Sequence, residues 1–212
     1  MEKKAVRRQD VRGIVPILLG QLFLLIWVFD LRWYQLGINT VGYGLTIWGV
    51  SQLVRYHKSF KRAAPCLAFM AVWDVFWALA EPIIMRVEHH TGKILLWQQV
   101  ISMLVLASGM LVQVYYYCCL TFGLGKLAYV FGEKKLAHHL HYCHSLIFAT
   151  EGLELVILIV ETWVHIPFLA VRIGQVLLFL SYLYFAVLTY LLAYRLKQEV
   201  PVAEEEKKSE QA

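Results

Sequence analysis

Apolar residues along the chain gather in long blocks that short polar connections separate. A helix needs roughly 20 apolar residues to cross the hydrocarbon core of a bilayer. Six blocks approach this length, and they cover residues 13–29, 33–54, 65–85, 94–120, 142–164 and 166–194. The pattern predicts an all-α fold, a polytopic membrane helix bundle of about six transmembrane helices.

Proline and glycine positions refine this picture. Pro16, Pro65 and Pro167 fall in first turns, where a missing N–H costs little. Pro82 lies inside the third block and predicts a kink or a frayed end there. The second block contains several glycines that favour close helix packing, namely Gly37, Gly42, Gly44 and Gly49.

Composition agrees with a membrane protein. Of the 212 residues, 59% are hydrophobic and 17% are charged, whereas soluble domains average about 45–50% and 25%. The net charge of +5 comes mostly from Lys and Arg in the connections between blocks. Charges in such places orient a chain against anionic headgroups. We therefore expect the lipid bilayer, and not nucleic acid, as the partner of these basic residues.

Basic residues alternate between the two sides of the predicted bundle. One side carries Lys3, Lys4, Arg7, Arg8, Arg12, Arg55, Lys58, Lys61, Arg62, Lys126, Lys134, Lys135, Arg195, Lys197, Lys207 and Lys208, and the other only Arg32, Arg86 and Lys93. By the positive-inside rule both termini are cytoplasmic. This predicts a multi-pass protein of a cytoplasm-facing membrane, which in a bacterium is the inner membrane. Residues 1–198 form the predicted membrane domain, and 199–212 a disordered, charged cytoplasmic tail without an attached soluble domain.

Acidic residues interrupt two of the blocks. The stretch "FATEGLELVILIVETW", residues 148–163, carries Glu151, Glu154 and Glu161, and the third block carries Asp74 and Glu81. A charge at the bilayer centre costs at least about 2.5–3.5 kcal/mol on insertion scales. Such residues therefore face protein, water or one another, and they are candidates for substrate or ion binding.

Counting along the helices gives each acid a depth. Asp74 and Glu154 fall near mid-membrane, whereas Glu81, Glu161 and Arg172 fall nearer the outside. We expect the third, fifth and sixth spans to pack together, with Arg172 paired to Glu81 or Glu161. Asp74 and Glu154, which have no cation at their depth, are expected to share a proton or to bind a cation. The alternative is that the same residues only hold the helices together through polar contacts.

Histidines cluster before the fifth block, in "LAHHLHYCHS". His138, His139, His141 and His144 are candidate ligands for a divalent cation, and solvated interfacial histidines are the alternative. No histidine lies deep in a block, so we do not expect haem. The absence of lysine from the second to sixth blocks argues against retinal.

The cysteines and the aromatic residues indicate structural and not catalytic roles. All four cysteines fall near the predicted cytoplasmic face, where thiols stay reduced. The run "VYYYCC" at 114–119 is expected at the inner interface, as part of an aromatic belt. Neither G-x-S-x-G nor H-E-x-x-H occurs, which disfavours those hydrolases.

Three functions fit these features. The leading hypothesis is an integral membrane transporter or permeation subunit for a cation or small solute, proton-coupled through the intramembrane carboxylates. The alternative is a non-catalytic membrane subunit or sensor, whose charged residues serve assembly with other subunits or as a homo-oligomer. The third is a membrane-embedded enzyme acting on lipid or peptide, with the cytoplasmic histidines and Cys143 near its site.

Overall fold

A computed structural model describes residues 12–25, 32–91, 96–163 and 168–198, and every regular element in these ranges is an α-helix. The helices are α1 (Ile14–Leu25), α2 (Arg32–Leu53), α3 (Lys58–Thr91), α4 (Leu96–Val130), α5 (Lys134–Trp163) and α6 (Phe168–Gln198). The predicted all-helical fold is confirmed. The tail 199–212, predicted to be disordered, lies outside the described residues.

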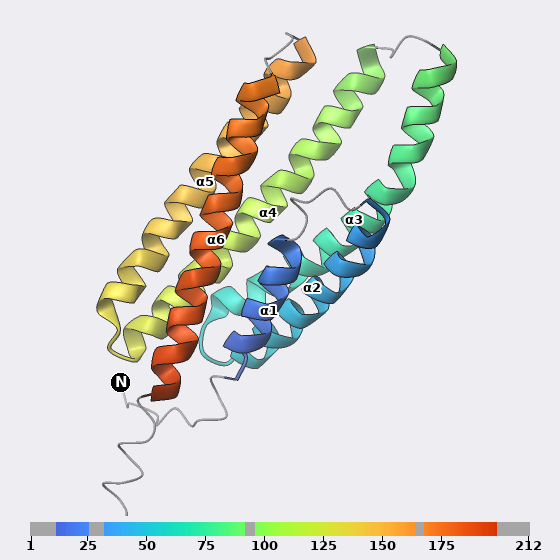
Figure 1. Ribbon diagram of the computed structural model, residues 1–212. Coiled ribbons are helices and arrows are strands. Elements are labelled where there is room, and N and C mark those ends of the chain that lie inside the picture. Colours follow the sequence, from blue (N-terminus) through green and yellow to red (C-terminus); the bar gives the residue numbers. More distant parts are fainter. Residues whose placement is uncertain (1–11, 26–31, 92–95, 164–167, 199–212) are drawn as a thin grey trace, which may run out of the picture.

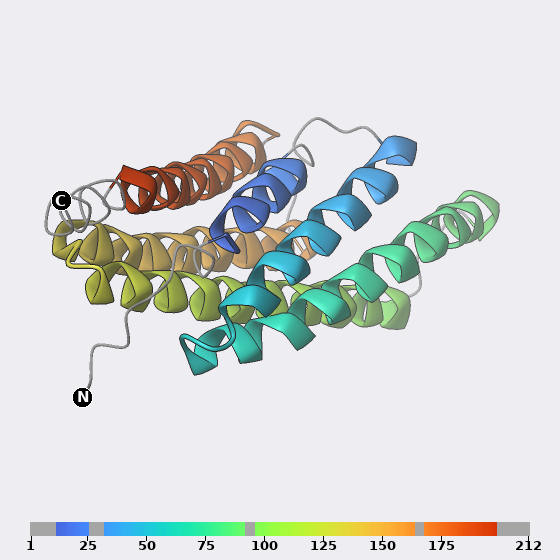
Figure 2. The same cartoon turned by 90° about the horizontal axis from the view of Figure 1, so that it is seen from below.

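The six helices form a closed ring in sequence order (Figures 1 and 2). Each helix packs against the next along the chain, and α6 packs against α1 to close the ring. Seen from below, α6, α1 and α2 form one layer, and α5, α4 and α3 form the other. The prediction that the third, fifth and sixth spans pack together is wrong for the third. Helix α3 packs against α2 and α4, and α5 lies on the other side of α4.

One end of the bundle carries most of the basic residues that the structure describes, whereas Arg172 lies near the start of α6 at the other end. At the first end α1 begins, the α2–α3 and α4–α5 turns lie, and α6 ends (Figure 1). Its exposed cations are Arg12, Arg55, Lys58, Lys61, Arg62, Lys126, Lys134, Lys135, Arg195 and Lys197. We call this the basic end.

Several helices are longer at the basic end than the apolar blocks predicted. Helix α4 continues to Val130, ten residues beyond its block, and α5 begins at Lys134 instead of 142. The extra turns contain lysines and histidines, which a helix tolerates but a count of apolar residues leaves out. Gly132 has a φ of 88° between these helices, where the amide of Glu133 donates to the carbonyl of Ala128 at 3.0 Å. At the opposite end, helix α3 runs past Pro82 to Thr91.

Helices α1 and α2 approach each other through glycine. A Cβ added to Gly20 would lie 2.6 Å from the carbonyl oxygen of Gly42, and one added to Gly49 would lie 2.7 Å from Cγ1 of Ile17. Neither distance is tolerable, so these positions require glycine. Gly37 and Gly44 face open space instead. The predicted close packing of the second span therefore rests on Gly42 and Gly49 alone.

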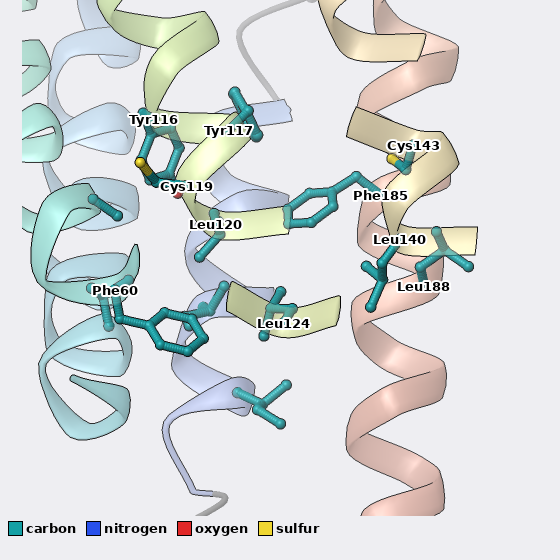
Figure 3. Close-up of a cluster of buried hydrophobic side chains, with 14 of the residues drawn as sticks. Phe60, Tyr116, Tyr117, Cys119, Leu120, Leu124, Leu140, Cys143, Phe185 and Leu188 are labelled. Atoms are coloured by element: carbon teal, nitrogen blue, oxygen red, sulfur yellow. The ribbon is translucent and has the colours of Figure 1, made fainter. Parts of the chain in front are cut away.

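The apolar core fills the half of the bundle nearest the basic end (Figure 3). Phe60 of α3 lies against Gly123 of α4, whose missing side chain leaves room for the ring. The fully buried side chains include Leu120, Leu124, Leu140, Phe185 and Leu192. Burial of a Leu or Phe side chain contributes roughly 1.5–3 kcal/mol where water is the alternative. This core holds the helices together beneath the polar residues described next.

Three described stretches are long and apolar enough to cross a membrane, namely Lys58–Leu79, Met103–Val130 and Leu169–Lys197. Large apolar side chains on them point outward, with Val72 70%, Leu104 65% and Leu169 70% exposed. Water would disfavour such surfaces, whereas lipid solvates them. These stretches support a membrane protein. Helix α1 is apolar but shorter than a span.

Candidate functional site

Asp74 of α3 is held by two neutral donors from α2. Nδ2 of Asn39 and the hydroxyl of Tyr43 both donate to Oδ2 of Asp74, at 2.8 and 2.9 Å. Asp74 is half-buried, whereas Asn39 and Tyr43 are 7% and 6% exposed. The spacing of Asn39 and Tyr43, four residues, places both on one face of α2. A carboxylate therefore sits at the α2–α3 contact without a cationic donor in these two bonds.

Gln21 of α1 joins two adjacent tyrosines of α4. Its Nε2 donates to the hydroxyl of Tyr116 at 2.6 Å, and its Oε1 accepts from the hydroxyl of Tyr117 at 2.7 Å. All three side chains are buried. Gly20, next to Gln21, lies against Gly42, next to Tyr43, which brings the Asp74 group near this one. The expected place of the "VYYYCC" run at an interface is thus wrong for Tyr116 and Tyr117, although Tyr115 is exposed.

Glu151 of α5 lies at the α5–α6 contact, on the other side of the bundle from Asp74. It is 2% exposed and accepts a short hydrogen bond from the hydroxyl of Tyr182 on α6. Nε2 of Gln113 on α4 donates to the same hydroxyl at 2.7 Å. The rings of Tyr117 and Tyr182 have centroids 4.6 Å apart. Glu151 is therefore one tyrosine away from the Gln21 group.

These groups form one layer across the bundle, which we call the polar belt. Its residues are Gln21, Asn39, Tyr43, Asp74, Gln113, Tyr116, Tyr117, Glu151 and Tyr182, and all six helices contribute. Asp74, Glu151 and Tyr182 each lie about 24–26 Å along their helices from the basic end, at about 1.5 Å per residue. A carboxylate stands at either side of the belt, with tyrosines and glutamines between them.

The structure places Glu154 beside Glu151 and away from Asp74. Glu154 interacts electrostatically with Glu151. Its carboxylate lies against Gly174 of α6, because a Cβ added there would be 3.2 Å from Oε1 of Glu154. Helix α4 stands between α3 and α5, and sharing of one proton by Asp74 and Glu154 stays a prediction.

The predicted pairing of Arg172 with Glu81 or Glu161 is described in part. Arg172 is exposed, and its Nη1 donates to Oε1 of Gln175 at 2.9 Å. The side chains of Glu81 and Glu161 lie outside the described residues. Pairing of Arg172 with either acid stays a prediction.

The four histidines lie in the first turns of α5 and have different neighbours. The rings of His141 and His144 stack with centroids 6.3 Å apart, and His139 Nδ1 lies 3.0 Å from the hydroxyl of Tyr184. Nε2 of His144 is 3.9 Å from Sγ of Cys118. Among the described residues no three His, Cys, Asp or Glu side chains gather into a metal site. The predicted divalent-cation site at His138, His139, His141 and His144 is not assembled by these side chains.

Sequence reasoning missed the tyrosines of the belt. Gln21 and Gln113 do hydrogen-bond inside the bundle, whereas Ser108 bonds the carbonyl of Val105 in its own helix. The hydroxyls of Tyr43, Tyr116, Tyr117 and Tyr182 carry the links between helices, but an aromatic residue in an apolar block indicates packing first.

Comparison with protein-family models, with curated proteins and with solved structures gave no match to this chain. Function is therefore argued from the geometry of the polar belt.

Proposed function

We propose that the chain is an integral membrane transporter or permeation subunit for a cation or small solute, proton-coupled through the carboxylates of the polar belt. It crosses the bilayer six times, with the basic end and both termini cytoplasmic. The observation that carries the proposal is the belt itself, in which Asp74 and Glu151 lie at one level on opposite sides of α4. Intramembrane carboxylates that face a bundle interior mark ion and proton paths.

The belt is suited to passing protons as well as to holding an ion. Every hydroxyl between the two carboxylates can both donate and accept a hydrogen bond. Gln21 contacts two tyrosines at once, and Tyr182 contacts Glu151 and Gln113 at once. Asp74 is the group open to a solute, because it is half-buried and its donors are neutral. Glu151, which is buried, is the internal proton acceptor.

The apolar core between the belt and the basic end supports gated passage. Phe60, Leu120, Leu124 and Phe185 have no measurable exposure, so the cytoplasmic half is closed in this state. A transporter with a central site needs one closed side at a time. On this proposal the apolar core closes the cytoplasmic side of the belt.

The test is flux into vesicles that contain the purified full-length chain and a trapped pH indicator. Monovalent and divalent cations are supplied one at a time, followed by small neutral solutes. We expect one class to move protons, and Asp74→Asn to abolish that movement. Glu133→Gln is the matched control, because Glu133 is a carboxylate outside the belt, paired with Arg195. Equal flux in wild type and Asp74→Asn would refute the proposal.

A non-catalytic subunit or sensor is the second candidate. One observation favours it, since the hydrogen bonds that make up the belt join different helices and would also clasp the bundle. On this account neither carboxylate variant changes any flux, and the chain co-purifies with a fixed membrane partner.

A further inference from the structure

A cluster of cations lies at the basic end of the α3–α4 contact. His57 directly precedes α3, Lys58 and Arg62 lie one turn apart on α3, and Lys126 lies near the end of α4. The rings of His57 and Phe122 have centroids 5.6 Å apart, and Nζ of Lys126 is 5.5 Å from the centroid of Phe122. Residues of both helices thus meet around one aromatic ring. We call His57, Lys58, Arg62 and Lys126 the α3–α4 cationic cluster.

The positive charges of this cluster are not balanced by acids among the described residues. Partial burial lowers the pKa of His57, and the charges of Lys58, Lys126 and Arg62 lower it further. The three cations are exposed, and the first turn of α3 contains no acidic residue. Glu133, a described acid at the same end of the bundle, pairs with Arg195 and not with a residue of this cluster. Like charges held together without a counter-charge favour binding of an anion.

The local backbone also favours an anion. The amide of Ser59 donates to Nδ1 of His57 at 3.2 Å, which leaves the proton of the neutral ring on Nε2 as a donor. The helix dipole is positive at this end of α3, where the amides of Ser59 and Phe60 both donate to His57. Phosphate is the common biological anion that takes several N–H donors together.

An exposed apolar stripe leads away from the cluster along α4. Leu111, Tyr115 and Phe122 are 62%, 48% and 46% exposed, and the stripe ends at Lys126. Tyr115 also interacts electrostatically with Arg62, which places the stripe beside α3. Both helices are candidate spans over this length, Lys58–Leu79 and Met103–Val130. A ligand that fits both features has a phosphate at one end and hydrocarbon behind it.

We propose that the α3–α4 cationic cluster and the adjoining stripe form a specific site for one anionic phospholipid. Lys58, Arg62 and Lys126 bind the headgroup phosphate, and the acyl chains lie along Leu111, Tyr115 and Phe122. This site rests on the proposed membrane insertion with the basic end at the cytoplasmic interface. The lipid site does not rest on the proposed transport. If one of the two proposals is refuted, the other can still be tested.

The experiment measures lipid binding to the purified full chain by native mass spectrometry at physiological salt. Phosphatidylglycerol is the probe and phosphatidylcholine the reference lipid. The variant Lys58→Gln/Arg62→Gln/Lys126→Gln is compared with Lys134→Gln/Lys135→Gln/Lys197→Gln, which removes equal charge from the same end. We expect the first to bind phosphatidylglycerol about 10- to 100-fold more weakly and the control to stay within about twofold.

Other outcomes would overturn the proposal. Equal weakening in both variants would mean that bulk charge, and not a site, attracts the lipid. Displacement of phosphatidylglycerol by millimolar inorganic phosphate would assign the cluster to a free anion. Tighter lipid binding after deletion of 199–212 would assign it to the glutamates at 204–206 of the same chain.

A variant that alters only the stripe keeps the test independent of the charges. Leu111→Ser/Phe122→Ser retains every cation and is expected to weaken phosphatidylglycerol binding severalfold. Lys58→Arg/Lys126→Arg retains the charge and is expected to bind as wild type. Should the triple variant fail to fold, Lys126→Gln alone serves, and unchanged binding in it would contradict the assignment of Lys126 to the headgroup.

Discussion

The two carboxylates of the polar belt sit in opposite halves of the bundle and have different surroundings. Asp74 is half-buried, and two side chains of a single neighbouring helix, Asn39 and Tyr43, donate to one of its oxygens. Glu151 is 2% exposed, and its donor, Tyr182, is itself held by Gln113 of a third helix. Asp74 thus has redundant donors and an open side, whereas Glu151 depends on one hydroxyl.

This difference assigns different roles. A half-buried carboxylate can exchange a proton or a solute without separating helices. A buried one exchanges only through its neighbours, here the hydroxyl of Tyr182. On the proposed function, Asp74 is accordingly the site of exchange and Glu151 stores charge, and the Glu151–Tyr182 bond joins α5 to α6.

The largest expected effect is on vesicle flux, when Asp74 or Glu151 is replaced by its neutral amide. Asp74→Asn should reduce solute flux by about 10- to 100-fold, because a charge-assisted contact contributes about 1.5–3 kcal/mol. Glu151→Gln should retain solute binding but uncouple it from proton movement. Vesicle flux with a pH indicator measures both. Equal behaviour of the two variants would remove the distinction between exchange and storage.

The next largest effect is expected on the free energy of unfolding, when a tyrosine hydroxyl is removed from each half of the belt. Tyr182→Phe leaves Glu151 and Gln113 without their shared partner, so it should cost about 1–3 kcal/mol of unfolding free energy. Tyr43→Phe leaves Asn39 on Asp74 and should cost only about 0.5–1.5 kcal/mol. Denaturant unfolding in mixed micelles measures both. A larger loss for Tyr43→Phe would invert the comparison.

Chemical labelling sharpens the same contrast without mutation. A hydrophobic carbodiimide should modify Asp74 faster than Glu151, because only Asp74 has an accessible side. Peptide mapping by mass spectrometry follows the two rates in one sample. The candidate solute should protect Asp74. Faster labelling of Glu151 would show that the belt opens on the α5–α6 side.

The smallest effect is expected at Gly174, behind Glu154. A Cβ there would meet Cδ1 of Ile157 at 2.8 Å and Oε1 of Glu154 at 3.2 Å, and both are ends of flexible side chains. Gly174→Ala should therefore cost less than about 1 kcal/mol of unfolding free energy. The same unfolding assay applies. A loss as large as that of Tyr182→Phe would make Glu154 part of the rigid Glu151 group.

Much of the fold could be predicted from the apolar blocks, but helix ends and neighbours could not. Block 94–120 located α4, yet the helix runs ten residues farther because Lys126 and its neighbours continue it without being apolar. Depth along each helix predicted that Asp74 and Glu154 lie near one level, and in the structure Glu154 lies about one turn beyond Glu151 on α5. Depth does not say which helices are adjacent, and α4 separates the two acids.

The hydrogen bonds of the polar belt could not be predicted from the sequence, for a physical reason. Gln21 and Tyr117 are 96 positions apart, and Gln113 and Tyr182 are 69 apart. Periodicity within one helix has no information on such pairs. A tyrosine at an interface and a tyrosine in a buried network have the same local sequence. The glycines show the same limit, since Gly42 and Gly44 look equivalent in sequence and only Gly42 contacts α1.

The most direct test of the ion-binding belt is proton release on cation binding, measured with the purified chain in lipid nanodiscs. Wild type, Asp74→Asn and Glu133→Gln are titrated with the cation that vesicle flux identifies. Wild type and Glu133→Gln should each release protons as the cation binds, and Asp74→Asn should neither bind nor release. Equal binding and equal release in Asp74→Asn would contradict the account.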